Sequence, residues 1–191
     1  MDLAVVTQLF LLYFILPLWL LAGVADWLCH RASHIESTTG AKETVIHLLM
    51  LVEMGVPVLA GLLLEINALV LLGMLVAFLL HEATSIWDVS YAVSRRNVTP
   101  VEQHVHSYLE MLPLMGLSFL ACLNWPQALA IFGFGPESAD WGVRFKDDPL
   151  PAGYLIAMLG LIVLFEVLPY LEEFWRGWRA NDGHLVPRSR P

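Results

Sequence analysis

Charged residues are scarce in this chain of 191 residues, of which only 15% are Asp, Glu, Lys or Arg. A soluble domain typically carries roughly 25% charged residues, so this scarcity argues against a soluble globular protein. Hydrophobic residues make up 58% of the chain. The composition therefore predicts an all-α integral membrane protein.

Signatures of secretion, disulfide bonding and nucleotide binding are also missing. The first hydrophobic run, residues 3–24, has neither a basic leader nor a small-residue cleavage site, so we expect a retained helix. Cys29 and Cys122 lie in or beside predicted spans and do not imply a disulfide. No glycine-rich phosphate loop is present, and the net charge of -8 argues against nucleic acid as a partner.

Five hydrophobic segments approach or exceed the roughly 20 residues that a helix needs to cross a bilayer. We place these spans at residues 3–28, 44–64, 67–87, 106–124 and 152–171. We expect one transmembrane domain over residues 1–175 and a basic cytoplasmic tail over residues 176–191. The last seven residues, LVPRSRP, resemble a protease-cleavage tail, and a native basic tail fits them equally.

Lysine and arginine are distributed unevenly between the two ends of the predicted helices. With the N-terminus outside, only Arg144 and Lys146 lie in external segments. The internal segments then hold Arg31, Lys42, Arg95, Arg96, Arg176, Arg179, Arg188 and Arg190. Because basic residues favour the cytoplasmic side, we expect a multi-pass protein of the inner (plasma) membrane with its C-terminus in the cytoplasm.

Two short connections on the internal side turn the chain back on itself. Gly40 is expected to end a first helix that projects beyond the membrane, and AKETVIH begins the second helix. In TPVE, Thr99 is the expected N-cap, Pro100 the first helical residue and Glu102 the capping-box acid. We therefore expect two antiparallel hairpins that project on the cytoplasmic side and form a four-helix bundle.

Histidines and acids gather at matching depths below these two turns, counted at about 1.5 Å of rise per residue. Helical spacing also places many of them on common faces, as for Asp26 and His30 or His106 and Glu110. A charged group near the bilayer centre costs roughly 2.5 to 3.5 kcal/mol, so such a cluster must be paired, hydrated or bound to metal. The predicted metal ligands are Asp26, His30, His34, His47, His81, Asp88, His106 and Glu110.

Glu53 and Tyr91 are the candidate catalytic residues. Glu53 lies within an apolar segment, where an acid is functional by default, and we expect it to act as a ligand or a proton carrier. Tyr91 lies near the site and could donate a hydrogen bond, although interfacial anchoring is the simpler role.

Other polar residues have simpler interpretations. The acids at the membrane ends could pair with Arg31, Arg95 or Arg96 instead of binding metal. Glu36 and Glu43 are interpreted as solvated loop acids. Glu102 is explained mainly by the capping box, His104 is expected to lie outside the ligand set, and Glu166 could complete or neutralise the site.

The motif HRASH, His30 to His34, resembles the first HxxxH box of membrane fatty-acid desaturases and hydroxylases. That resemblance implies a di-iron centre on the cytosolic side. The chain departs from the family because it has no paired HxxHH boxes and offers only EQHVH and a lone HE. Carboxylates take their place, which is similar to ferritin-type di-iron bundles, although the ExxH pairs of those bundles are also absent.

Nitrogen and oxygen donors without thiolate suit iron, manganese or zinc, and we expect two metal ions, with iron first. The leading hypothesis is a di-metal oxidoreductase of hydroxylase or desaturase type, whose lipid or other hydrophobic substrate enters from the bilayer. Because no flavin or nicotinamide motif is present, such an enzyme requires an electron-donor protein.

The sequence is compatible with three other functions. One is a metal transporter, chaperone or sensor without redox catalysis, against which the absence of internal repeats counts. Another is a b-type haem protein, for which so many carboxylates would be unexpected. The third is a hydrolase that uses a zinc-activated water molecule.

Overall fold

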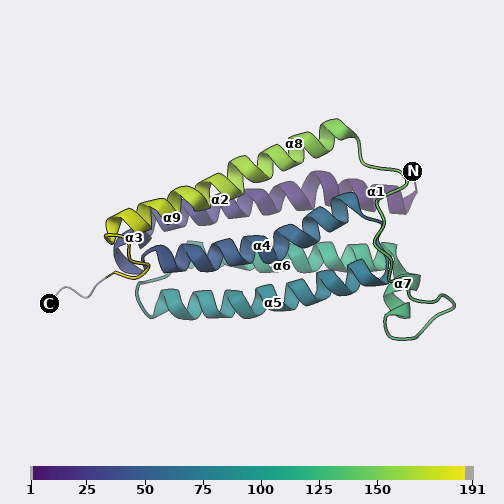
Figure 1. Cartoon of the computed structure of the whole chain (residues 1–191), viewed down its shortest axis with the longest axis horizontal. Coiled ribbons are helices and arrows are strands. Elements are labelled where there is room, and N and C mark those ends of the chain that lie inside the picture. The colour runs from purple at the N-terminus through teal and green to yellow at the C-terminus, as the bar shows by residue number, and fades with distance from the viewer. Residues whose placement is uncertain (1, 188–191) are drawn as a thin grey trace.

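The computed structural model describes residues 2–187, and apart from one β-bridge between Leu64 and Phe145 their regular structure is helical (Figure 1). The elements are α1 (Leu3–Phe10), η1 (Leu11–Ile15), α2 (Leu16–Ser33), α3 (Ile35–Thr38), α4 (Ala41–Leu63), α5 (Ala68–Val93), α6 (Pro100–Leu123), α7 (Trp125–Ala130), α8 (Ala152–Ile162), η2 (Val163–Val167) and α9 (Leu168–Ala180). The π-helical turns η1 and η2 each join two α-helices into one continuous helix.

When the α-helices joined by a π-helical turn are taken as one, five helices of the described chain are long and apolar enough to cross a membrane. Large hydrophobic side chains such as Leu21, Val56 and Ile86 are exposed on their outer faces, with 62 to 70% of their surface accessible. The buried positions include many acids and histidines. A soluble protein shows the reverse pattern, so the structure is compatible with the all-α multi-pass membrane protein that the composition predicts.

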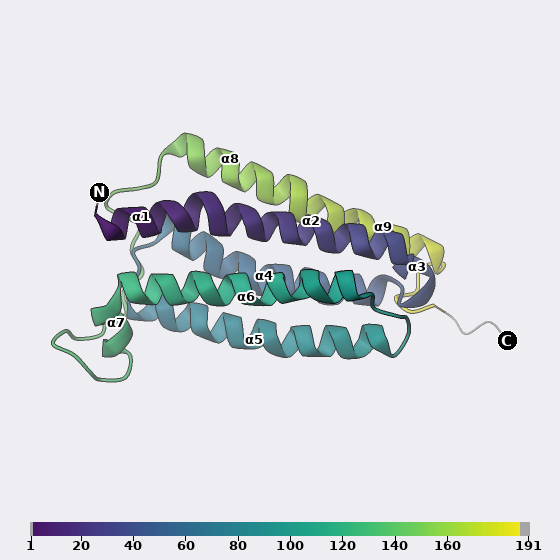
Figure 2. The same ribbon diagram turned by 180° about the vertical axis from the view of Figure 1, so that it is seen from behind.

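The long helices form an elongated bundle in which α2 packs against α6, α6 against α5, α5 against α4, and α4 against α9. Contacts between α9 and α2 close the ring. Figure 1 shows α4 between α9 and α5, and Figure 2 shows α6 between α2 and α5. The fifth long helix, formed by α8, η2 and α9, therefore belongs to the bundle. The sequence predicts a bundle of four helices.

The first turn differs from the prediction. α2 ends at Ser33 because His34 adopts a left-handed conformation with φ of 51°, and the short helix α3 follows. Gly40, with φ of 73°, directly precedes α4, and a Cβ at this position would lie 2.6 Å from the carbonyl oxygen of Leu185. Gly40 therefore opens α4 rather than ending the first helix.

The second turn has the helix N-cap that the sequence predicts. The Thr99 hydroxyl accepts a hydrogen bond from the Glu102 N–H at 3.2 Å, and Pro100 is the first residue of α6. The Glu102 carboxylate does not complete the capping box, because it binds Arg96 instead.

The helices extend past the predicted spans at the end of the bundle where α9 ends. α5 continues to Val93, α6 begins at Pro100, and α9 continues to Ala180, inside the segment predicted as a tail. Hydropathy marks only the apolar part of a helix, and these polar ends are stabilised by contacts with one another. Arg188 and Arg190 of the predicted tail lie outside the described residues.

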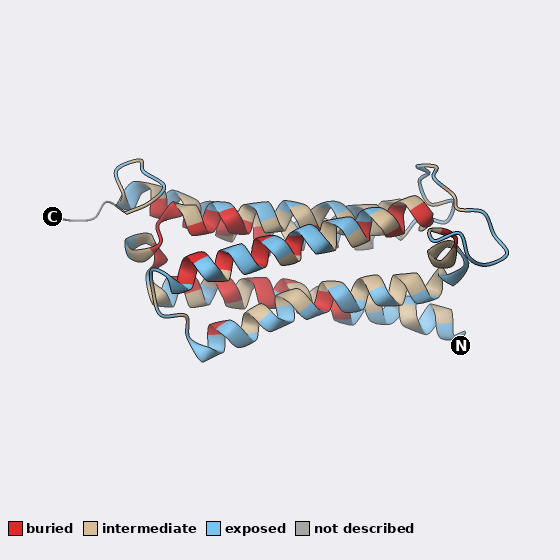
Figure 3. Ribbon diagram, turned by 90° about the horizontal axis from the view of Figure 1, so that it is seen from below, coloured by how far each residue is buried: buried red, intermediate tan, exposed pale blue. Residues whose placement is uncertain are grey.

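Burial is distributed along the inward faces of the helices (Figure 3). At the end that carries the N-terminus, Leu20, Leu62 and Met158 form an apolar core between α2, α4 and α8. At the opposite end the interior is polar, and α9 lies very close to α4. Only a glycine fits there, because a Cβ at Gly177 would lie 2.9 Å from the backbone nitrogen of Ala41.

Replacing Gly177 by alanine tests this close contact. The added methyl group would also lie 3.1 Å from the Ala41 Cα, so α9 and α4 must separate. We expect a lower melting temperature of the purified protein in detergent, equivalent to about 1–3 kcal/mol of overpacking. Gly153→Ala in α8 is the matched control, since no atom lies within 4 Å of its added Cβ. An equal loss in both variants would contradict the contact.

Candidate metal centre

Acids and histidines from every long helix fill the polar end of the bundle. We call these residues the His/carboxylate cluster: Asp26 and His30 of α2, Glu43 and His47 of α4, Asp88 of α5, Glu102 and His106 of α6, and Glu173 of α9. All are at most 4% exposed except His106, whose side chain is 12% exposed. Three helices use the same spacing, an acid followed four residues later by a histidine, which places both on one helical face.

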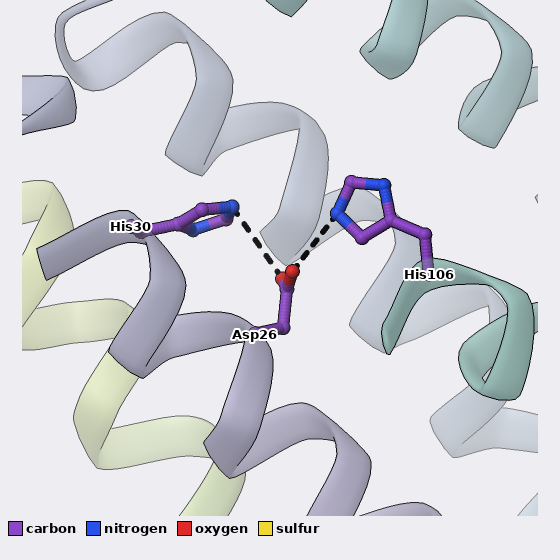
Figure 4. A group of neighbouring side chains, drawn as sticks. All are labelled: Asp26, His30 and His106. Atoms are coloured by element: carbon purple, nitrogen blue, oxygen red, sulfur yellow. Dashed lines mark hydrogen bonds and ion pairs between the residues drawn. The ribbon is translucent and has the colours of Figure 1, made fainter. Parts of the chain in front are cut away.

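Asp26 connects three helices at the centre of the cluster. Figure 4 shows its carboxylate between the rings of His30 and His106. The Oδ1 atom lies 2.9 Å from His106 Nε2, Oδ2 lies 3.6 Å from His30 Nε2, and the Tyr170 hydroxyl donates to Oδ2 at 3.4 Å. One ligand atom from each of Asp26, His30 and His106 lies within 4.8 Å of the others, so this group could hold a metal ion.

The ring of His30 is oriented by Glu173. Its Nδ1 lies 3.1 Å from Glu173 Oε2, and a neutral imidazole that donates from Nδ1 keeps a free lone pair on Nε2. Nε2 has no hydrogen-bond partner among residues 2–187 and faces Asp26, Glu43 and Glu102 at 3.6 to 3.8 Å. Histidine ligands of metals commonly have such a carboxylate behind them.

His47 forms a second layer against His30. The two rings stack with centroids 4.6 Å apart and planes inclined by 14°. His47 Nε2 lies 3.0 Å from Asp88 Oδ2, while Nδ1 and the other Asp88 oxygen have no hydrogen-bond partner in the described chain. His30, Glu43 and His47 make a second group that could hold a metal ion.

Arg96 reaches into the cluster from the turn between α5 and α6. Its guanidinium binds both Glu43 and Glu102. Burial by itself would lower the pKa of Arg96, but the hydrogen bonds and charges of Glu102 and Glu43 raise this pKa above its ordinary value. The guanidinium therefore remains a permanent cation of the cluster.

The formal charge of the cluster is strongly negative. Five carboxylates, each at most 1% exposed, share one guanidinium, which leaves four negative charges when the imidazoles are neutral. Uncompensated buried charge is very unfavourable, so the cluster must hold protons or cations. Two divalent cations would balance this charge.

His34 lies outside the cluster, contrary to the sequence prediction. The left-handed conformation at this residue ends α2 and turns its side chain outward, where 75% of it is exposed and it lies 3.4 Å from Glu36. The HRASH motif therefore contributes only His30.

His81 and Glu110 lie deeper in the bundle than the cluster and belong to neither ligand group. Glu110 accepts a hydrogen bond from the Ser85 hydroxyl at 2.6 Å. The acid that joins His106 in the cluster from α6 is Glu102, four residues before it, rather than the predicted Glu110, four residues after it.

The two predicted catalytic residues have other partners. Glu53 accepts a hydrogen bond from the Thr84 hydroxyl at 2.9 Å, away from the cluster. The Tyr91 hydroxyl donates to the carbonyl oxygen of Thr39 at 2.7 Å, so it ties α5 to the first turn. Neither side chain belongs to the two ligand groups among the described residues.

Sequence reasoning missed three acids of the cluster. The sequence predicts Glu43 as a solvated loop acid, yet it and Glu102 are fully buried beside Arg96. Glu173 was outside the predicted fifth span, which ended at residue 171. Its signal in the sequence is the spacing of Glu166, Tyr170 and Glu173 by four and three residues, which places them on one helical face.

A cavity of about 730 Å³ adjoins the cluster. Asp26, His47, Asp88 and His106 form part of its wall, and most of the remaining wall is aliphatic. The lining includes side chains that are exposed on the outer surface of α4 and η2, among them Val56 and Val163. The cavity therefore opens on the apolar outer surface of the bundle.

Comparison with known proteins gives no relative: no family model, curated protein or solved structure matches the chain. The resemblance of HRASH to a desaturase box extends to only one residue of the cluster, since His34 lies outside it.

Replacing Arg96 by methionine tests the charge balance of the cluster. The change removes the guanidinium and leaves Glu43 and Glu102 without a cation, and breaking a buried ion pair costs roughly 3–5 kcal/mol. We expect the melting temperature of the metal-free variant to fall sharply, and added divalent ions to raise it more than they raise that of the wild type.

Arg95→Met is the matched control for this experiment. The Arg95 guanidinium stacks on the Tyr91 ring at 5.3 Å and forms no ion pair within residues 2–187. Similar melting temperatures for the two metal-free variants would show that Arg96 does not neutralise the cluster.

Proposed function

We propose that this protein is a membrane-embedded di-metal oxidoreductase that acts on a hydrophobic substrate. The observation that carries the proposal is the shared wall between the cluster and the cavity, formed by Asp26, His47, Asp88 and His106. A molecule in this cavity would lie directly against the candidate metal ligands while its remaining surface contacts aliphatic side chains.

The donor set and its charge support two metal ions, iron first. Asp26 and His106 would hold one ion and Glu43 and His47 would hold the other, and the single free Nε2 lone pair of His30 would complete one of these two sites. Asp88 and Glu102 supply further carboxylate oxygens. Helical bundles build di-iron and di-manganese centres from such histidines and carboxylates on facing helices.

A di-iron centre would supply activation of O₂ next to the substrate. Hydroxylation uses one O₂, two electrons and two protons, places one oxygen atom into a C–H bond and releases the other as water. Desaturation removes two hydrogen atoms from the substrate and, with the same two electrons and two protons, converts O₂ to two water molecules. The chain has no nicotinamide or flavin motif, so we propose that an electron-donor protein supplies the electrons.

We also propose that the cluster lies on the cytoplasmic side of the inner (plasma) membrane, with the N-terminus outside. Basic residues support this orientation. Arg144 and Lys146 lie at the end opposite the cluster, whereas the cluster end carries Arg31, Lys42, Arg95, Arg96, Arg176 and Arg179. A cytoplasmic donor protein could then reach the cluster end.

The two histidines of HRASH provide a matched pair for testing metal binding. We expect wild-type protein purified without added metal to contain about two iron ions per chain, as expected for a di-iron bundle. His30→Ala should lose most of this metal because Nε2 faces three carboxylates, whereas His34→Ala should keep it because that side chain is exposed. Elemental analysis measures both, and equal metal content in the two variants would contradict the assignment.

The cavity can be blocked without changing the cluster. Gly55 lines the cavity and no atom lies within 4 Å of a Cβ added there, so Gly55→Leu should fill the space. We expect normal iron content but a severalfold lower rate of O₂ uptake with a chemical reductant and membrane lipids. Gly73→Leu in α5 is the control, because it has equal space and does not line the cavity.

An oxygen electrode measures the uptake, and mass spectrometry detects an oxidised or desaturated lipid. Equal uptake by Gly55→Leu and the wild type would argue against the cavity as the substrate site. Zinc alone in the purified protein, with no O₂ uptake, would instead support a hydrolase.

A further inference from the structure

Glu166 is a buried acid that the cluster does not use. It lies in a membrane-spanning helix, is 7% exposed and lines the cavity beside the cluster. Its Oε1 atom is buried without a hydrogen-bond partner, and Glu166 forms no ion pair in the described part of the chain. It also belongs to neither ligand group.

The backbone around Glu166 leaves space for its carboxylate. Glu166 lies in the π-helical turn η2, and single π-helical turns within α-helices frequently occur at functional sites. On the facing helix α2, a Cβ at Gly23 would lie 2.1 Å from Glu166 Oε2 and 2.5 Å from Oε1. The glycine leaves the space that the carboxylate occupies.

The other three acids of the cavity wall have side-chain partners, which are His106 for Asp26, His47 for Asp88 and Ser85 for Glu110. Among the described acids of the cavity wall, Glu166 alone has no side-chain hydrogen-bond partner. A buried carboxyl group without a hydrogen-bond partner is energetically unfavourable. A carboxylate requires a donor, whereas a protonated carboxyl group requires an acceptor as well. A hydroxyl group meets both needs because it donates and accepts. An ammonium group donates but cannot accept, so it meets only the first of these needs.

A second cavity lies beyond the first and shares an apolar wall with it. This second cavity, of about 670 Å³, shares the wall residues Leu16, Trp19, Met54 and Val58 with the first. These shared side chains line both the space beside the cluster and the space nearer the other end of the bundle. The first cavity and the shared wall therefore provide room for a long apolar chain that follows the helices toward the second cavity, whose lining also includes Glu65, Lys146 and Asp148.

From these observations we propose that Glu166 binds the hydroxyl group of a long-chain hydrophobic molecule whose tail extends toward the second cavity. This inference rests on the proposed function, because it assigns the substrate class of the same site. Glu166 would hold the hydroxyl end beside the cluster and so select hydroxylated molecules over plain hydrocarbons.

The test compares a terminally brominated long-chain alkanol with the matching bromoalkane. Bromine quenches the fluorescence of a nearby tryptophan, and Trp19 lies in the wall shared by the two cavities. Quenching that is lost in Trp19→Phe therefore reports binding in this space. We expect full-length protein in detergent to bind the alkanol about tenfold more tightly, as one hydrogen bond to a buried charged group allows.

Substitutions distinguish the effect of the Glu166 carboxyl group on binding from the effect of its surroundings. Glu166→Leu should abolish the tenfold preference, whereas Glu166→Gln should keep most of it because an amide both donates and accepts. Gly23→Ala should reduce the preference by displacing the carboxylate. Gly160→Ala in α8 should leave it unchanged, since no atom lies within 4 Å of its added Cβ.

Each binding measurement is made with metal-loaded protein and with chelator-treated protein. A preference for the alkanol in protein that never binds metal would support the inference while the proposed oxidoreductase function fails. Equal binding of alkanol and alkane by the wild type, a preference retained in Glu166→Leu, or tighter binding of a bromoalkylamine would overturn the inference. Loss of metal from Glu166→Leu would also overturn it, because Glu166 would then be a metal ligand.

Discussion

Neutralisation of the buried carboxylates is the constraint on which the rest of the structure depends. Asp26, Glu43, Asp88, Glu102 and Glu173 are almost completely buried, and their depth in the bundle leaves little water to screen them. One guanidinium and a set of imidazoles contact several of these acids at once. The turn between α5 and α6 places the Arg96 guanidinium against Glu43 and Glu102, whereas α9 adds Glu173, which contacts His30.

The arrangement of partners explains why the polar end could work as a reactive site. Glu173 orients His30 from behind, and Asp88 contacts His47, so the imidazoles are held by acids on other helices. The unpartnered Nε2 of His30 points toward three carboxylates, while the neighbouring cavity is largely aliphatic. A polar ligand set and an apolar binding space therefore share one wall inside the bundle.

Local patterns in the sequence determined the five helices and the gathering of polar residues at one end. Hydropathy marks an apolar helix because each side chain must match lipid, and a spacing of four residues places Asp26 with His30 on one face whatever the neighbours are. For the same reason the TPVE cap was predictable, since a cap depends on a few adjacent residues. These features require no knowledge of which helices meet.

Only the tertiary structure decided the membership of the cluster. His34 was excluded by the left-handed conformation at its own backbone, although its spacing from His30 placed it on the same face. Glu43 and Glu102 were included because Arg96 folds in between them, and Glu173 because Gly177 lets α9 approach α4. Such contacts join residues far apart in the chain, and their energy depends on burial and on partners that a local pattern does not contain.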